Sequence, residues 1–177
     1  MLTGWLILSA HVLPPHLFLF LARASGSKQL FLSHSWNLDV VGRDNHSRVK
    51  RISTALTHRG FTVWLDETEM VGNIVEAMAN GIDDSVLFVA FVTSAYIDKV
   101  NTRGGENNCK LEFRHAYATK GPSKMIVVVM KNAVLSARPW QGLLGAAVGS
   151  HPFVDLTSDT TSAFDKGIEY LERLASS

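Results

Sequence analysis

The sequence predicts a three-layer α/β domain, in which a five-stranded parallel sheet has helices on both faces. Three observations predict it. Five short runs rich in Val, Ile, Leu and Phe recur after residue 28, helical patterns separate them, and no hairpin signal joins two neighbouring runs. Strands separated by helices run parallel, because each connection must cross over the sheet. The most apolar run, residues 85–93, is typical of a central strand covered on both sides.

The first strand and helix follow from the start of the domain. Residues 28–33 form a short apolar run that indicates a buried strand. After a polar loop, Asp44 or Asn45 can cap a helix that ends at Gly60. One face of this helix is apolar, and its basic residues are expected largely on the solvent side: Arg48, Lys50, Arg51 and Arg59.

The middle of the chain continues the alternation of strands and helices. Residues 61–65 are rich in β-formers and predict the second strand. Apolar residues at helical spacing between 74 and 83 predict the second helix. The third strand is followed by a short helix, a polar loop and a longer helix, which we expect over residues 94–100, 101–108 and 109–119.

The C-terminal part completes the sheet. Residues 124–130 predict the fourth strand and residues 152–156 a fifth, shorter one. Between them lies a Gly-rich segment, residues 137–149, with room for a short helix, and Asp159 or Thr160 begins the last helix. The predicted architecture is therefore flavodoxin-like, and ligands are expected beyond the carboxyl ends of the strands.

Composition fits one folded domain and excludes several classes of protein. The chain has 177 residues, of which 46% are hydrophobic and 19% charged, enough to bury a core. A formal net charge of +1 gives no electrostatic reason to expect nucleic acid as a partner. The single cysteine excludes an intramolecular disulfide and a cysteine-rich zinc site. We therefore expect a reduced, near-neutral domain in the cytoplasm.

Residues 1–27 differ from residues 28–177 and are expected to lie outside the folded domain. No Lys, Arg, Asp or Glu occurs before Arg23, and an apolar stretch of this length can cross a membrane. However, the pair Pro14-Pro15 interrupts it, and proline breaks helix hydrogen bonding. Three interpretations stay open: a membrane anchor over residues 2–22 with the domain on its cytoplasmic side, a cleaved signal, or a leader with neither role.

The strand ends offer few established chemical motifs. The sequence has no Walker A motif, no Gly-x-Gly-x-x-Gly after a strand and no Gly-x-Ser-x-Gly. Four histidines lack metal-ligand spacing and are expected on the surface or in turns: His46, His58, His115 and His151. We expect neither a metal nor a resident cofactor. His34 lies between two serines, which either belong to a catalytic site or satisfy backbone groups at the strand end.

Five segments, in order, resemble the motifs of TIR domains. Phe31-Leu32-Ser33-His34-Ser35-Trp36 resembles the motif that closes the first strand, and residues 60–66 resemble the second strand. Residues 70–74 are similar to the BB loop, and residues 81–85 to the turn before the third strand. Cys109-Lys110-Leu111-Glu112-Phe113 resembles the Cys-x-x-Glu-Leu segment of catalytic members.

The resemblance runs from about Gln29 to about Leu174 and covers nearly the whole predicted domain. It is greatest to TIR-like domains of microbial eukaryotes. That likeness rests on the Asp-Glu-x-x-Met pattern of residues 66–70 and on Trp140 with the Gly-rich segment behind it.

The resemblance implies one of two activities. Many TIR domains with the helical glutamate cleave NAD+ at the nicotinamide–ribose bond when they self-associate, whereas others are non-catalytic modules that assemble with further TIR domains. In the first case NAD+ is the substrate, no cofactor is needed and Glu112 is catalytic. The substrate-binding residues that the resemblance then implies are Ser33, His34, Ser35, Trp36, Gly72 and Asn73.

Each of these residues also has a plainer interpretation. Glu112 could be an ordinary surface glutamate of an amphipathic helix. Trp36 could stack on nicotinamide or adenine, or instead fill the edge of the core. Cys109 is expected to be a small buried residue without catalytic function. Several catalytic members have a basic residue after the first strand where this chain has Ser-His-Ser-Trp, and the nearest cations in this sequence are Arg43 and Arg48.

Overall fold

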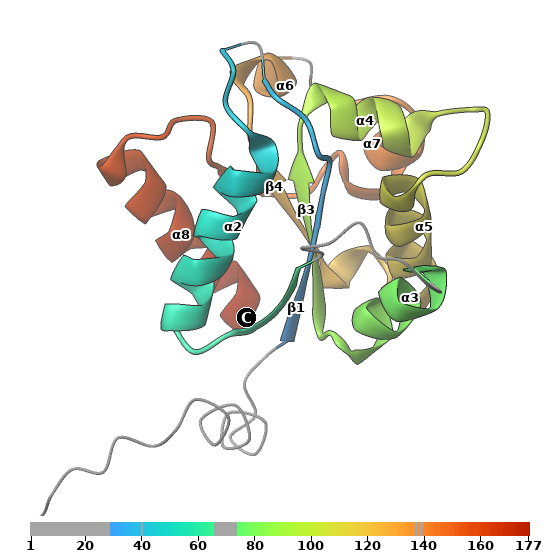
Figure 1. Cartoon of the computed structure of the whole chain (residues 1–177), viewed down its shortest axis with the longest axis horizontal. Coiled ribbons are helices and arrows are strands. Elements are labelled where there is room, and N and C mark those ends of the chain that lie inside the picture. The colour runs from blue at the N-terminus through green and yellow to red at the C-terminus, as the bar shows by residue number, and fades with distance from the viewer. Residues whose placement is uncertain (1–28, 40, 66–73, 137, 139) are drawn as a thin grey trace, which may run out of the picture.

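The computed structural model describes residues 29–39, 41–65, 74–136, 138 and 140–177 (Figure 1). The leader of residues 1–27 and the expected substrate-binding residues Gly72 and Asn73 lie outside the described residues. In the described part of the chain, no helix is both long and apolar enough to cross a membrane.

The described strands form one parallel sheet in the order β2-β1-β3-β4-β5. Their bounds are Gln29–His34 for β1, Thr62–Leu65 for β2, Leu87–Val92 for β3, Met125–Val129 for β4 and Phe153–Asp155 for β5. Each strand lies inside or within one residue of the run that predicted it. The predicted α/β class and parallel sheet are confirmed.

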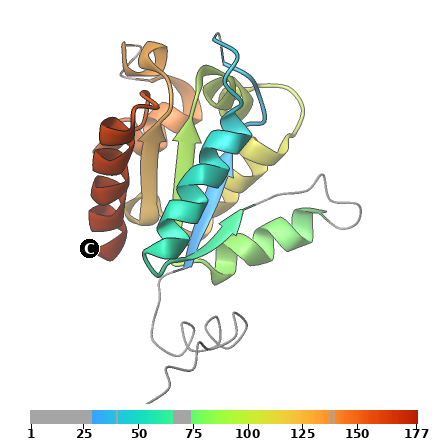
Figure 2. The same cartoon turned by 60° about the vertical axis from the view of Figure 1, so that its left-hand side comes forward.

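Helices cover both faces of the sheet (Figures 1 and 2). One face packs against α2 and α8, and the other against α3, α4, α5 and α7. The bounds are α2 Asn45–His58, α3 Ile74–Asp84, α4 Ser94–Asn101, α5 Asn108–Lys120, α7 Gly142–Val148 and α8 Thr161–Ser176. A 3₁₀ turn, Pro122–Lys124, precedes β4, and a short helix, α6 Asn132–Ser136, follows it. The sequence analysis did not predict α6.

Local signals fix several helix ends. The Asp44 side chain caps α2 by accepting a hydrogen bond from the backbone N–H of Ser47, and Thr93 caps α4 in the same way. Gly121, with φ of 72°, ends α5 in a backbone conformation that favours glycine. Thr93 directly follows β3, so α4 begins at the carboxyl end of that strand. Asn45, the first residue of α2, donates to the carbonyl oxygen of Ser35 just beyond β1.

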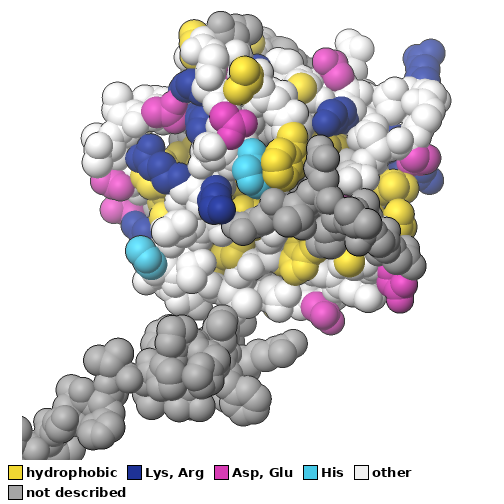
Figure 3. Space-filling model, viewed as in Figure 1, with side chains coloured by type: hydrophobic (Ala, Val, Ile, Leu, Met, Phe, Trp, Pro, Cys, Tyr) yellow, Lys and Arg dark blue, Asp and Glu magenta, His cyan; other side chains and the backbone are white. Residues whose placement is uncertain are grey.

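The core consists of two apolar layers, one on each face of the sheet. Alternate residues of the central strands contribute to each layer, so that Phe31 and Phe88 face α3 and α5 while Leu32 and Val89 face α2 and α8. On the first side the ring of Phe31 stacks on Trp64 of β2, with centroids 4.4 Å apart. On the face shown in Figure 3, basic and acidic side chains are interspersed over the surface, as a near-neutral net charge suggests.

The stack of Trp64 on Phe31 leaves no room for a side chain at Gly81 of α3. A Cβ atom at position 81 would lie 2.7 Å from the Trp64 ring, closer than such atoms approach. The Gly81→Ala variant should therefore lose about 1–3 kcal/mol of unfolding free energy, because overpacking forces the ring or the helix to move. Chemical denaturation followed by tryptophan fluorescence measures the loss.

Gly104→Ala is the matched control, because a Cβ at position 104 would meet no atom within 4 Å and the residue has no positive φ. This control should be neutral or slightly stabilising. Equal stability of Gly81→Ala and the wild type would contradict the packing described here.

Candidate functional site

β1 ends in Ser33 and His34, and Ser35 follows it; all three polar residues are buried. Because side chains alternate along a strand, neighbours in this motif point to opposite faces of the sheet. Ser33 contacts Glu112 of α5 on one side, whereas His34 contacts His46 of α2 on the other. The motif therefore supplies groups to both sides of the carboxyl edge.

Glu112 is buried and has a partner from β1. Its side chain is only 6% exposed, and its Oε2 atom accepts a hydrogen bond from the Ser33 hydroxyl at 2.5 Å. The Ser33 Oγ atom also lies 2.8 Å from the hydroxyl oxygen of Tyr96 on α4. A glutamate held in this way is not an ordinary surface glutamate, so that interpretation of Glu112 is wrong.

A cavity of about 290 Å³ opens beside Glu112 at the carboxyl edge of the sheet. Its volume is near the lower end of the range for small-molecule sites. The residues that line it come from the end of β1, from α4 and from the start of α5: Leu32, His34, Trp36, Lys99, Asn107, Asn108, Cys109 and Glu112. A second cavity, of about 320 Å³, lies between β5 and α8, and its titratable residues are Asp155, Lys166 and Tyr170. Among its described lining residues there is no buried carboxylate.

His34 and Trp36 line one side of the cavity, and the ring of His46 stacks with both behind them. The Trp36 ring lies 3.8 Å from that of His46 with an interplanar angle of 17°, and the His34 ring lies 5.1 Å from that of His46. Trp36 is 46% exposed. The interpretation of Trp36 as a residue that fills the core is therefore wrong, and its ring is available to solvent next to the cavity.

His34 is neutral at physiological pH. Its Nε2 atom lies 2.8 Å from Nδ1 of His46, so one ring donates a hydrogen bond to the other. Burial, together with the charge of His46, lowers the pKa of His34 from 6.5 to about 4. His46 was expected on the surface or in a turn, but its pairing with His34 makes it part of this site.

Cys109 lines the cavity without being a nucleophile. Its thiol is 5% exposed and lies 3.4 Å from the carbonyl oxygen of His34. Burial, with the carboxylate of Glu112 nearby, raises the pKa of the Cys109 thiol to about 12. The thiol is thus protonated at neutral pH and lacks the thiolate that nucleophilic chemistry requires.

Ser35 binds within the protein and does not line the cavity. Its hydroxyl donates to Oδ1 of Asn37 at 2.6 Å and lies 2.9 Å from Oγ1 of Thr93. The Ser35 carbonyl accepts from the side chain of Asn45. Ser35 thereby joins the end of β1 to the first residue of α2 and to the cap of α4. Its hydroxyl contacts the side chains of Asn37 and Thr93, not the backbone groups that the plainer interpretation of the motif assigned to it.

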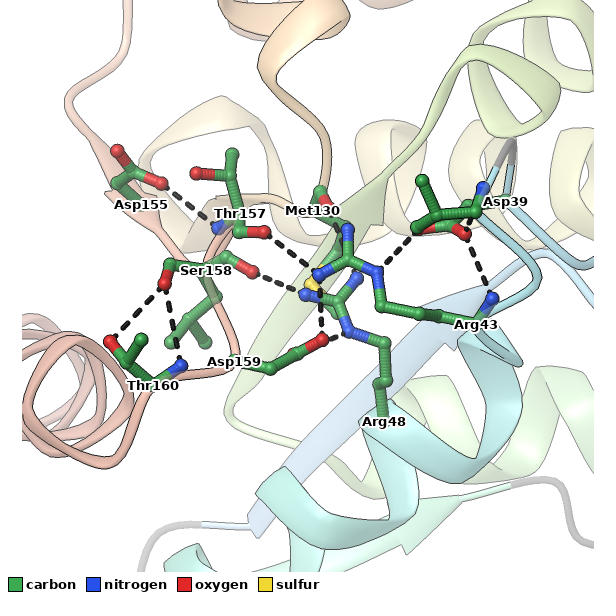
Figure 4. A network of polar contacts seen from close by, with 11 residues as sticks. Asp39, Arg43, Arg48, Met130, Asp155, Thr157, Ser158, Asp159 and Thr160 are labelled. Atoms are coloured by element: carbon green, nitrogen blue, oxygen red, sulfur yellow. Dashed lines mark hydrogen bonds and ion pairs between the residues drawn. The ribbon is translucent and has the colours of Figure 1, made fainter.

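Arg43 and Arg48 are the arginines nearest in sequence to the Ser-His-Ser-Trp motif. Both bind away from the cavity, in the network of polar contacts shown in Figure 4. Arg48 pairs with Asp159 at 2.9 Å and donates to the carbonyl oxygens of Met130 and Leu156. Its side chain is 13% exposed, so the expectation that it lies on the solvent side of its helix was wrong.

Arg43 belongs to the same network. It pairs with Asp39 at 2.7 Å and with Asp159 at 2.6 Å, and it donates to the carbonyl oxygen of Thr157. Among the described residues that line the cavity, Lys99 is the basic one.

The structure thus brings His34, Trp36 and Glu112 together around one cavity, with Ser33 behind Glu112 and Ser35 further inside. Among the described residues of the site, sequence reasoning missed five: His46, Tyr96, Lys99, Asn107 and Asn108. A local signal that could have pointed to two of them is the spacing of Tyr96 and Lys99. They lie three residues apart, and so on one face, of a helix that follows a central strand. No group of three His, Cys, Asp or Glu suited to a metal occurs within the described ranges.

Comparison with known proteins identifies the fold and the family model that this chain matches. The sequence model of the TIR domain matches residues 30–171. A crystal structure of a prokaryotic SEFIR domain superposes with a TM-score of 0.60 at 22% sequence identity, over 84% of this chain and 99% of that one. At that identity the likeness shows a shared fold. No curated protein matches the sequence.

The low pKa of His34 predicts a specific loss of stability in acid. The unfolded chain binds a proton at His34 below pH 6.5, whereas the folded chain does so only near pH 4. Folding is therefore favoured less as the pH falls from 6.5 towards 4, by about 2 kcal/mol between pH 7 and pH 5. His34→Gln should flatten the decline of unfolding free energy over that interval.

Denaturation curves at pH 7, 6 and 5 measure this effect. His58→Gln is the control, because His58 is exposed at the end of α2, and it should keep the wild-type slope. A His34→Gln variant with an unchanged slope would show that His34 is not the group responsible.

Proposed function

The chain belongs to the TIR domain family and is a TIR-type signalling domain, and we propose that it cleaves NAD+ at the nicotinamide–ribose bond when it self-associates. The observation on which this proposal depends is the buried carboxylate of Glu112, which lines a cavity of about 290 Å³ at the carboxyl edge of the sheet.

The reaction needs little from the protein beyond a well-placed negative charge. The nicotinamide of NAD+ is already cationic and leaves as a neutral base, so no general acid has to protonate it. Breaking the bond builds positive charge on the ribose, as in glycoside hydrolysis, and a water molecule then bonds to the same ribose carbon and releases a proton to the solvent. A single carboxylate, fixed in advance and shielded from water, stabilises that charge and can hold the ribose hydroxyls. Glu112 has these properties.

The aromatic side of the cavity suits a flat, cationic ring. The Trp36 ring stacks on His46 with one face, and Trp36 is 46% exposed. A pyridinium ring next to an indole gains both stacking and cation–π attraction. With His34 neutral, no positive charge from that ring opposes the approach of the substrate cation. We therefore assign Trp36 and His34 to the nicotinamide side of the site.

A second candidate, a non-catalytic module for TIR–TIR assembly, is favoured by the scarcity of cations. Within the described residues, Lys99 is the basic side chain in the cavity lining, while Arg43 and Arg48 pair with aspartates elsewhere. A diphosphate calls for cationic partners. In the catalytic proposal a neighbouring copy supplies them on assembly, which is why we expect activity to depend on self-association.

Glu112→Gln should strongly slow nicotinamide release from NAD+. The amide keeps the size of the side chain and can still accept from Ser33, but it has no negative charge to stabilise the transition state. We expect a loss of about 100-fold or more, as for other preorganised groups that stabilise transition-state charge. Chromatography of the products from the wild type and variant, each at a series of protein concentrations, measures the rate.

Glu169→Gln is the matched control, since Glu169 is an exposed glutamate of α8. It should keep full activity. A wild type that releases no nicotinamide, even at high concentration or when forced to oligomerise, would favour the assembly module; an active Glu112→Gln would show that the site is wrongly assigned.

Trp36→Ala should raise KM for NAD+ while leaving the folded domain intact. Stacking of a base on an aromatic side chain is worth roughly 1–3 kcal/mol, so the expected rise in KM is about tenfold. Trp36→Phe should recover most of the affinity. Steady-state kinetics over a range of NAD+ concentrations separates KM from kcat, and an unchanged KM in Trp36→Ala would remove Trp36 from the site.

A further inference from the structure

The hydrogen bonds around Glu112 have a fixed direction. A hydroxyl group has one hydrogen to donate, and that of Ser33 points to Oε2 of Glu112. The contact of 2.8 Å between Ser33 Oγ and the Tyr96 hydroxyl must then be donated by Tyr96. The three residues form a chain in which Tyr96 donates to Ser33 and Ser33 donates to Glu112.

Tyr96 is well suited to be the first donor of this chain. It is fully buried in α4, and its backbone N–H donates to the Thr93 side chain that caps the helix. Burial, with Cys109 and Glu112 nearby, raises the pKa of the Tyr96 phenol well above its ordinary value of 10. The phenol therefore keeps its hydrogen at neutral pH and remains available to donate to Ser33.

This chain of hydrogen bonds affects Glu112 although Tyr96 does not contact the cavity. Tyr96 is absent from the cavity lining, whereas Glu112 belongs to it. A hydroxyl that already accepts a hydrogen bond is a stronger donor, because linked hydrogen bonds polarise one another. The Ser33 hydroxyl is thus both aimed at Glu112 and strengthened as a donor, which favours the charged form of the carboxylate and one orientation of it.

We infer that Tyr96 is a positioning residue, which acts through Ser33 to hold the Glu112 carboxylate charged and oriented towards the cavity. This inference rests on the proposed NAD+ cleavage for its catalytic consequence. It also assigns Ser33 a role different from substrate contact: the Ser33 side chain, 1% exposed, lies behind Glu112 and transmits the effect of Tyr96.

The test is a double-mutant cycle between Tyr96→Phe and Ser33→Ala. Each single variant removes one hydroxyl and keeps the surrounding packing. Ser33→Ala should lower kcat by about tenfold, the effect of one hydrogen bond to a charged group, and Tyr96→Phe by about threefold to tenfold, because Tyr96 donates to a neutral hydroxyl. KM should stay within about twofold, because neither group touches the substrate. The double variant should be no slower than Ser33→Ala, since without Ser33 the Tyr96 hydroxyl has no route to Glu112.

Two outcomes would overturn the inference in an active enzyme: wild-type kcat in Tyr96→Phe, or losses that multiply in the double variant. Tyr117→Phe is the control, because Tyr117 is 41% exposed on α5, and it should retain wild-type kinetics. Thermal unfolding of every variant identifies losses that come from misfolding.

A second readout does not require turnover. The carboxyl-carbon NMR signal of Glu112, assigned by its loss in Glu112→Gln, should shift in Ser33→Ala and in Tyr96→Phe, with no further shift in the double variant. If the wild type cleaves no NAD+ but these shifts occur, the proposed function fails and the coupling of Tyr96 to Glu112 stands. If Tyr96→Phe leaves the signal unmoved, the coupling itself is wrong.

Discussion

The structure depends on the hydrogen-bond partners of the polar side chains that are buried at the end of β1. An unpaired buried polar group costs roughly 1–3 kcal/mol, so three in succession require partners at defined places. Strand alternation sends Ser33 towards α4 and α5 and His34 towards α2, while Ser35 binds the cap of α4. Three separate helices are thereby fixed to one point of the sheet. The cavity lies beside this point, between the end of β1, α4 and the start of α5.

A second set of contacts fixes the loops on the other side of this edge. Arg48 reaches from α2 to the backbone oxygens at the ends of β4 and β5, and Asp159 joins it to Arg43. Exposed ion pairs contribute little to stability, but guanidinium groups that also bind main-chain carbonyls define the path of the chain. The loop after β1 is therefore attached to the start of α8, and both arginines have a structural role.

The order and type of the main elements could be predicted because their signals are local. Strand runs, helical spacing and caps such as Asp44 and Gly121 are each contained in a few consecutive residues. The five residues of α6 are too few to show a period. Contacts between distant residues could not be predicted from spacing: Ser33 meets Glu112 from 79 positions away, and Arg48 meets Leu156 from 108. For the same reason His46, Tyr96 and Lys99 were missed, although family resemblance pointed to Glu112.

The state of Cys109 has a consequence for how assembly of this domain can be measured. It is the sequence's single cysteine, and its thiol is both nearly inaccessible and protonated at neutral pH. Reagents such as maleimides react with accessible thiolates, so the folded chain offers them almost no native target. One cysteine placed on the surface can then carry a fluorophore or a spin label selectively, with the native residue and its contact to His34 left in place. Distances between copies become accessible without altering the cavity.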